Sequence, residues 1–289
     1  MSENSASESL SPAHTSSNHP WRRYVALGDS FTEGIGDPDP QNPGRHRGWA
    51  DRLAQQLSTT VPDFAYANLA IRGRLIGQII SEQLAPAIDL KPDLISICAG
   101  GNDVIRPGGD PDRIAERLER AIRELSKTGA TILLLTGPDI RDTPVLGGIR
   151  GKVAIYNENV RAIAQRYDAV VGDLWALNEL RQTRMWDPDR LHFSPLGHQV
   201  IATMALDALN VPHEQSLNAQ LDNAPRSWRE ARIEDLHWAR EYFAPWVLRR
   251  IRHQSSGDGV TAKRPVPTSF TLQPPNESLG AGDSAPKQS

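Results

Sequence analysis

Residues 24–30 read Tyr-Val-Ala-Leu-Gly-Asp-Ser, a short apolar run that ends in a Gly-Asp-Ser turn. A continuous apolar run of this length is typical of a strand buried on both faces, as in a parallel sheet covered by helices. Four similar runs follow, at residues 64–69, 94–98, 131–135 and 169–174. The sequence therefore predicts a sheet of five parallel strands.

Amphipathic segments lie between these runs. Trp49, Leu53 and Leu57 recur every four residues, and a second apolar stripe covers residues 114–125 after Asp110-Pro111, a pair that favours a helix start. Helices are also expected over 156–167 and 195–209. This alternation predicts a three-layer α/β/α sandwich with right-handed crossovers, in which a site lies beyond the carboxyl ends of the strands.

The chain of 289 residues is long enough to bury a substantial core, and 38% of its residues are hydrophobic. We expect a single folded domain over 21–212, followed by a helical extension over 213–252. Residues 1–20 and 253–289 are rich in Ser, Pro, Gly and polar residues, and we expect both to be disordered tails. The extension carries several Trp residues, and Pro245 should divide it into two helices, which act either as a structural brace or as a lid beside the site.

Composition argues against several classes of protein. A formal net charge of -3 provides no basic excess for nucleic-acid binding. Cys98 is the only cysteine, which excludes an intrachain disulfide and a thiolate metal cluster. No run approaches the roughly 18 apolar residues of a membrane span. Residues 1–20 also lack the basic and apolar regions of an export signal, so we expect a cytoplasmic protein without stable membrane insertion.

Four short segments follow the predicted strands or lie in the loop before the last helix. They are Gly28-Asp29-Ser30, the stretch from Asn68 to Gly73, Gly101-Asn102-Asp103, and Asp189-Arg190-Leu191-His192. A serine nucleophile needs a base, a group that orients the base, and donors for the oxyanion that forms on attack. The segments offer a candidate for each of these roles.

Ser30 is the predicted nucleophile, and His192 is the predicted general base that later protonates the leaving group. Asp189 precedes the histidine by three residues, a spacing that lets its carboxylate fix the imidazole tautomer, and Asp187 is the alternative for this role. His198 begins the last helical stretch and is expected to be a surface or packed residue.

The predicted oxyanion donors are the backbone amides of Ser30 and Gly73 and the side-chain amide of Asn102. Glycine at position 73 would allow the backbone to approach the substrate closely. Asp29 is expected to bond backbone amides of the turn that exposes the serine hydroxyl.

Together the four segments resemble those of the SGNH, or GDSL, hydrolase superfamily, over about residues 24–209. The resemblance implies a flavodoxin-like fold and the hydrolysis of an ester, thioester or amide without a metal or other cofactor. The expected partner is a small-molecule, lipid or sugar acyl ester. Ala70 departs from the family pattern, which often has glycine at that position, and this puts only the detail of the loop in doubt.

The predicted activity is that of a serine esterase or lipase that works through an acyl-enzyme. Transfer of the acyl group to an alcohol or sugar, deacetylation of a carbohydrate, and a catalytically silent binding protein are the alternatives. A nucleotide or flavin binder is disfavoured by the absence of a glycine-rich phosphate loop. Three arginines lie close in sequence to the predicted oxyanion donors: Arg72, Arg74 and Arg106. They are either solvated surface residues or residues that favour binding of an anionic substrate. Oligomeric state is left open.

Overall fold

A sheet in the order β5-β4-β3-β1-β2-β6 forms the centre of the molecule. The structure is a computed structural model, and it describes residues 19–143, 146–214, 240–241 and 256–270. The first five strands are parallel, and their order is that of flavodoxin-like sheets, as predicted. They are β1 (Arg23–Gly28), β2 (Ala65–Asn68), β3 (Leu94–Cys98), β4 (Thr131–Leu135) and β5 (Val170–Gly172).

The sixth strand was not predicted. β6 (Arg264–Ser269) pairs antiparallel with β2 at one edge of the sheet. It lies within 253–289, so the expectation of a disordered tail there is wrong for these residues. At the other end of the chain, His19 was also placed in a disordered tail. Instead, its ring is buried, bonds the Leu57 carbonyl at 2.9 Å and stacks on Trp21.

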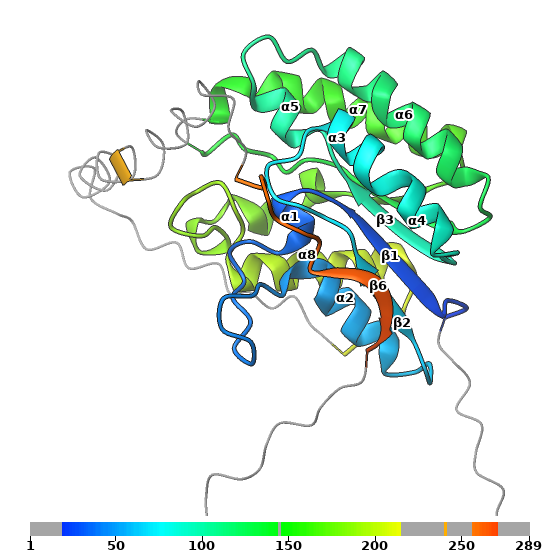
Figure 1. Cartoon of the computed structure of the whole chain (residues 1–289). Coiled ribbons are helices and arrows are strands. Elements are labelled where there is room, and N and C mark those ends of the chain that lie inside the picture. The colour runs from blue at the N-terminus through cyan, green and yellow to red at the C-terminus, as the bar shows by residue number, and fades with distance from the viewer. Residues whose placement is uncertain (1–18, 144–145, 215–239, 242–255, 271–289) are drawn as a thin grey trace, which may run out of the picture.

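The helices follow the strands along the chain (Figure 1). Asp110 caps α6 as predicted, because its carboxylate accepts hydrogen bonds from the Asp112 and Arg113 amides. α7 begins six residues before the predicted start, in a polar Arg-Gly-Lys stretch without an apolar stripe. The α-helices are α1 (Ser30–Glu33), α2 (Gly48–Ser58), α3 (Ile76–Ile79), α4 (Ala85–Asp89), α5 (Gly101–Ile105), α6 (Pro111–Ser126), α7 (Arg150–Arg166) and α8 (Pro195–Ala208). A π-helical turn, η1 (Ile80–Leu84), joins α3 to α4. The described residues also form four short 3-10 helices: η2 (Leu146–Ile149), η3 (Leu174–Ala176), η4 (Asn178–Arg181) and η5 (Thr183–Met185).

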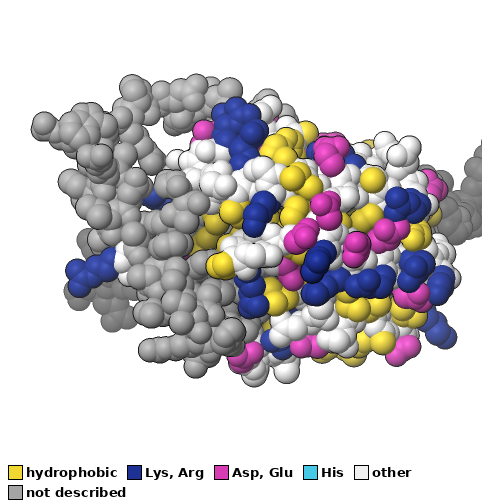
Figure 2. All heavy atoms as spheres, turned by 90° about the horizontal axis from the view of Figure 1, so that it is seen from above, with side chains coloured by type: hydrophobic (Ala, Val, Ile, Leu, Met, Phe, Trp, Pro, Cys, Tyr) yellow, Lys and Arg dark blue, Asp and Glu magenta, His cyan; other side chains and the backbone are white. Residues whose placement is uncertain are grey.

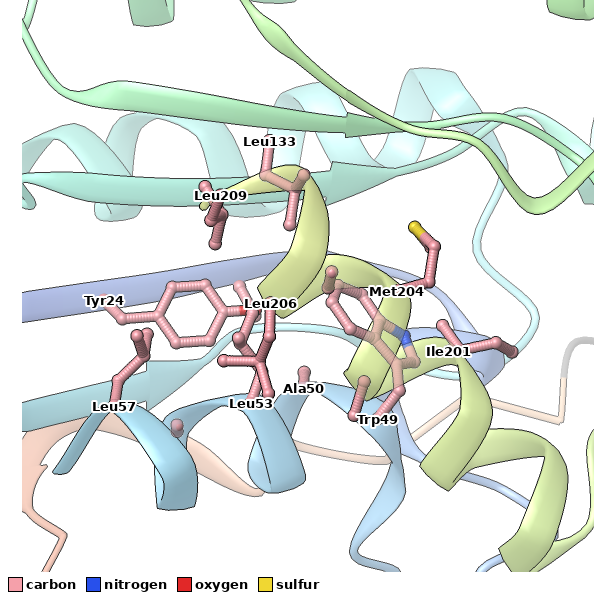
Figure 3. Packing of buried hydrophobic residues seen from close by; sticks show 14 of the residues in the cluster. Tyr24, Trp49, Ala50, Leu53, Leu57, Leu133, Ile201, Met204, Leu206 and Leu209 are labelled. Atoms are coloured by element: carbon pink, nitrogen blue, oxygen red, sulfur yellow. The ribbon is translucent and has the colours of Figure 1, made fainter. Parts of the chain in front are cut away.

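Two buried clusters cover the two faces of the sheet. Tyr24 and Ala26 of β1 belong to the cluster that includes α2 and α8, whereas Val25 and Leu27 belong to the cluster that includes α3, α6 and α7. This alternation follows from the period of two in a strand. Figure 3 shows the first cluster, in which side chains of α2 and α8 meet beneath the sheet. The three-layer sandwich is therefore confirmed.

Seen from above, the helical face carries basic and acidic side chains interspersed with apolar ones (Figure 2). Ion pairs such as Lys127–Glu124 and Arg166–Glu119 lie on α6 and α7. Within the described residues, no helix is long and apolar enough to cross a bilayer. Most of the predicted Trp-rich extension, at 215–239 and 242–255, lies outside the described residues, so its brace or lid role stays a prediction.

Candidate active site

The predicted nucleophile lies at the start of α1, directly after β1. Gly28 ends the strand with φ +152°, and a Cβ there would lie 2.6 Å from Thr32 Oγ1 and 2.7 Å from the Cys98 carbonyl oxygen. Only glycine fits this turn. Asp29 Oδ1 accepts a hydrogen bond from the Phe31 amide at 3.1 Å, which is the role expected of it. Ser30 is thereby held as the first residue of a helix, where backbone N–H groups have no partner within the helix.

Gln83 fixes the same turn from the side. Its amide accepts a hydrogen bond from Gly28 N at 2.9 Å and donates one to Gly28 O at 2.8 Å, and the side chain is almost fully buried. It lies in the π-helical turn η1, a rare conformation that is often found at functional sites. Gln83 was not predicted as part of the site, because nothing in the sequence pairs it with a position 55 residues away.

The predicted base and its orienting carboxylate are in direct contact. His192 Nδ1 lies 2.5 Å from Asp189 Oδ2, and Asp189 Oδ1 accepts hydrogen bonds from the amides of Leu191 and His192, both at 2.9 Å. Burial opposes ionisation of Asp189, but the side-chain hydrogen bond and charge of His192, together with the hydrogen bonds from the His192 and Leu191 amides, outweigh it and lower the pKa of the carboxyl. Arg190, with φ +55°, makes this turn tight enough for the contact.

Asp187, the alternative residue for orienting the imidazole, bonds the turn and not the His192 ring. Asp187 Oδ1 accepts a hydrogen bond from the Asp189 amide at 3.3 Å. The backbone amide of Asp187 donates to the His192 carbonyl at 2.9 Å and closes the turn. Burial raises the pKa of the Asp187 carboxyl. The geometry therefore favours Asp189 over Asp187 as the partner of the imidazole.

Asn102 joins the turn after β3 to the two neighbouring loops. Its amide donates hydrogen bonds to Asp29 Oδ2 at 3.0 Å and to the Arg74 carbonyl at 3.2 Å. Burial raises the pKa of Asp29 to about 6, although hydrogen bonds from Phe31 and Asn102 oppose the rise. The side chain of Asn102 thus connects the nucleophile turn to the loop that carries Gly73.

The loop of Gly73 is anchored by the arginines on either side of it. Gly73 has φ +74° and lies in a turn. Arg72 donates to the buried Glu33 through its backbone amide at 2.7 Å and through its guanidinium, so the loop is tied to α1. Arg74 Nε donates to Glu82 at 2.8 Å. Because Arg72 and Arg74 form these ion pairs, the structure lends no support to an anionic substrate at this loop.

A cavity of about 190 Å³ opens beside these residues. Ser30, Asn102 and His192 line it, and most of the other lining side chains are apolar. The apolar residues come from the ends of β3 and β4, from α5, from η2 and α7, and from the loop before α8; they include Val104, Ile105, Leu135, Ile140, Leu146, Ile149, Val153 and Leu191.

The predicted residues are brought together to different degrees. Ser30, Asn102 and His192 share the cavity, and Asp189 contacts His192. Gly73 is not one of the lining residues, but the carbonyl of its neighbour Arg74 is bonded by Asn102. Ser30 and His192 both belong to the described part of the chain, and their side chains are not hydrogen-bonded to each other. Such contacts are often long before a substrate binds. Among the described residues, no three His, Cys, Asp or Glu side chains are grouped as a metal site.

Comparisons with known proteins agree with this fold. The acetylxylan esterase of Geobacillus stearothermophilus, solved as a catalytic mutant, is 21% identical, with a TM-score of 0.55 over 68% of this chain and 97% of that one. TesA is 21% identical, with a TM-score of 0.54 over 65% and 97% of the two chains. LAE5, an alpha/beta hydrolase enzyme from the metagenome of Lake Arreo, Spain, is 21% identical, with a TM-score of 0.54 over 66% and 95%.

The family is established by sequence. A search of curated proteins found no match. The sequence model of the GDSL-like lipase/acylhydrolase family, however, matches residues 26–200, which is more than half of the chain and includes all four of the segments identified above. The chain belongs to the GDSL-like lipase/acylhydrolase family and is an ester-hydrolysing enzyme.

Proposed function

We propose that this enzyme is a serine esterase that works through an acyl-enzyme on Ser30. Ser30 Oγ attacks the carbonyl carbon of the ester while His192 accepts the hydroxyl proton. Collapse of the tetrahedral intermediate expels the alcohol, which takes that proton from His192. Water activated by the same imidazole then attacks the acyl-enzyme and releases the acid.

The observation that carries this proposal is the His192–Asp189 contact of 2.5 Å at the rim of the cavity that Ser30 also lines. An ionised Asp189 next to Nδ1 holds the proton on that nitrogen and leaves Nε2 to act as the base. The lowered pKa of Asp189 keeps the carboxylate ionised in the range where such a base functions.

The proposed oxyanion donors are the Ser30 and Gly73 amides and Asn102. Ser30 N lies at the start of α1, and neither of the two backbone amides donates to another described residue. The side-chain amide of Asn102 donates to Asp29 Oδ2 and to the Arg74 carbonyl, which keeps it next to the loop of Gly73, and one of these two hydrogen bonds must give way for Asn102 to donate to the oxyanion. Removing one donor of this kind typically costs about 3 kcal/mol of barrier stabilisation.

The cavity favours an acyl chain longer than acetyl. Its lining beyond Ser30 is mainly apolar, and each buried methylene contributes about 0.8 kcal/mol, or about fourfold in kcat/KM. We therefore expect kcat/KM to rise with chain length until the cavity is filled and to fall thereafter.

Deacetylation of a carbohydrate is the second candidate, because several of the similar structures are esterases that act on acetylated xylan or xylo-oligosaccharides. It requires a site in which the acetyl ester is the best substrate. Transfer of the acyl group to an alcohol or sugar uses the same acyl-enzyme and differs only in the final acceptor.

The test is hydrolysis of p-nitrophenyl esters from acetate to palmitate, with wild type, Ser30→Ala, and Ser126→Ala on α6 as the matched serine control. We expect Ser30→Ala to lose turnover, Ser126→Ala to retain it, and the optimum to lie above acetate. An optimum at acetate, with activity on acetylated xylo-oligosaccharides, would replace the acyl-chain proposal with the deacetylase. Turnover that requires an added alcohol would indicate a transferase, and full activity of Ser30→Ala would refute the proposed nucleophile.

A further inference from the structure

A segment outside the family match contacts the loop of Gly73. Residues 256–264, which we call the C-terminal strap, lie more than fifty residues beyond the matched range of 26–200 and lead into β6 (Figure 1). β6 is then held against β2 by antiparallel pairing. The strap therefore lies outside the part of the chain that the family model matches.

The strap meets the Gly73 loop on both sides of the glycine. Gly257 lies so close to the loop that a Cβ on it would come 2.1 Å from the Arg72 carbonyl oxygen and 3.0 Å from Ile71 Cγ2. Asp258 Oδ1 lies 3.5 Å from Arg74 Nη1. The first contact is between backbones, so a side chain on Gly257 would have no room. The second is an ion pair whose carboxylate is exposed.

The other end of the strap is anchored in the domain. Lys263 Nζ donates to the Arg47 carbonyl at 2.6 Å and to the His46 carbonyl at 3.1 Å, and it lies 2.8 Å from Asp51 Oδ1. Both side chains of this ion pair are largely buried. A buried charge that loses its partner is costly, so this anchor fixes where the strap runs.

Arg74 transmits the contact to the predicted oxyanion donors. Its side chain is only 12% exposed and its guanidinium lies between Glu82 and Asp258, while its carbonyl accepts the hydrogen bond from Asn102. Gly73, the adjacent residue, offers its own amide. A shift of this loop would therefore move the Gly73 amide and would also disturb the hydrogen bond that holds Asn102, and donors must already be in place when the oxyanion forms.

We propose that the C-terminal strap positions the oxyanion loop, with Gly257 and Asp258 as positioning residues that act through Arg72 and Arg74. This proposal rests on the function proposed above. It concerns the placement of the Gly73 amide and Asn102, not substrate binding in the apolar cavity. Substitutions in the strap should therefore lower kcat more than they change KM.

The experiment uses the full chain and p-nitrophenyl butyrate, with kcat, KM and thermal unfolding measured for each variant. Gly257→Ala is matched with Gly151→Ala in α7, where a Cβ meets nothing within 4 Å. Asp258→Asn and Asp258→Lys are matched with Glu158→Gln, which removes the exposed ion pair to Arg161. A trifluoromethyl ketone, whose serine adduct carries an oxyanion, reports separately on the donors.

We expect Gly257→Ala to lower kcat about tenfold or more while KM stays within about twofold, because a displaced donor loses much of its effect. Asp258→Asn should lower kcat only about twofold, because it removes an exposed ion pair. Asp258→Glu, which keeps the negative charge, should have a kcat close to wild type. Asp258→Lys should lower kcat more than Asp258→Asn does, because it places a second positive charge next to Arg74. Affinity for the ketone should fall in step with kcat. The two control variants should match wild type.

A folded Gly257→Ala enzyme with wild-type kcat and ketone affinity would overturn the proposal. If that variant does not fold, Asp258→Lys decides, and an unchanged kcat in it would also overturn the proposal. Ser30→Ala is assayed alongside. Its loss of turnover shows that the proposed function holds even where the strap proposal fails.

Discussion

Asp189 performs two tasks within one turn. One carboxylate oxygen accepts the Leu191 and His192 amides and shapes the turn, and the other contacts His192 Nδ1. Among the described residues, the side chain of Asp187 accepts a hydrogen bond only from the Asp189 amide. The two aspartates are chemically alike and lie two residues apart, so substituting each in turn separates orientation of the imidazole from support of the turn.

We expect Asp189→Asn to lower kcat by about 10⁴-fold, because an amide no longer fixes the imidazole tautomer or stabilises the imidazolium. Asp187→Asn should leave kcat close to wild type. Steady-state kinetics on p-nitrophenyl butyrate, with circular dichroism to confirm folding, measure both. A larger loss in Asp187→Asn than in Asp189→Asn would exchange their assigned roles.

Gln83 provides a second prediction for a single residue. Gln83→Met keeps the side-chain volume but removes both hydrogen bonds to Gly28, which costs about 1–3 kcal/mol for a buried backbone group left without a partner. Because Gly28 sets the turn of Ser30, we expect kcat to fall about tenfold or more with little change in KM. Gln55→Met, on α2, is the control. Stability loss without any loss of kcat in the folded variant would restrict Gln83 to a structural role.

Residue-level prediction worked where the chemistry is local. The spacing of Asp189 and His192 correctly places them in contact, and the Gly-Asp-Ser turn correctly follows a strand. The Glu33–Arg72 pair and the Gln83 bonds were not predicted, because they join residues 39 and 55 positions apart. Such contacts depend on the three-dimensional course of the loops, which periodicity does not reveal.

At the scale of elements, α2 and α8 pack on the same face of the sheet (Figure 3). His198 joins them: its Nδ1 accepts a hydrogen bond from the Trp49 amide at 3.1 Å, and its Nε2 donates one to the Ile35 carbonyl at 3.0 Å. It is a packed residue, one of the two alternatives expected from sequence. Burial lowers the pKa of His198 from 6.5 to about 4, so the ring is neutral in the folded state at neutral pH.

This pKa shift predicts acid sensitivity. Between pH 6.5 and about 4 the unfolded chain binds a proton at this histidine that the folded chain does not. The free energy of unfolding should therefore decrease as the pH falls, by up to about 1.4 kcal/mol per pH unit. We expect His198→Gln, whose amide can replace both hydrogen bonds, to flatten this slope in urea titrations. His213→Gln, just after α8, is the control, and an unchanged slope in His198→Gln would contradict the assignment.

At the scale of the whole molecule, the five parallel strands were predicted because each is a continuous apolar run, and α2, α6, α7 and α8 because they lie in amphipathic or helical segments between these runs. The short helices α1, α3, α4 and α5, of four or five residues each, were not predicted. β6 was not predicted either, because its sequence Arg-Pro-Val-Pro-Thr-Ser contains two prolines and little apolar character. Proline is tolerated at the edge of a sheet, and that is where β6 lies. Composition alone could not distinguish such a strand from a disordered tail. The cytoplasmic location and the roles of Ser30, Gly73 and Asn102 stay predictions.

The most direct test of the account is to identify the residue that carries the acyl group. The enzyme would be mixed with p-nitrophenyl butyrate, quenched in acid within milliseconds, digested and analysed by mass spectrometry. We expect a butyryl adduct on Ser30 that disappears in Ser30→Ala and builds up in Asp189→Asn only slowly. An adduct on another residue, or turnover by Ser30→Ala at the wild-type rate, would contradict the account.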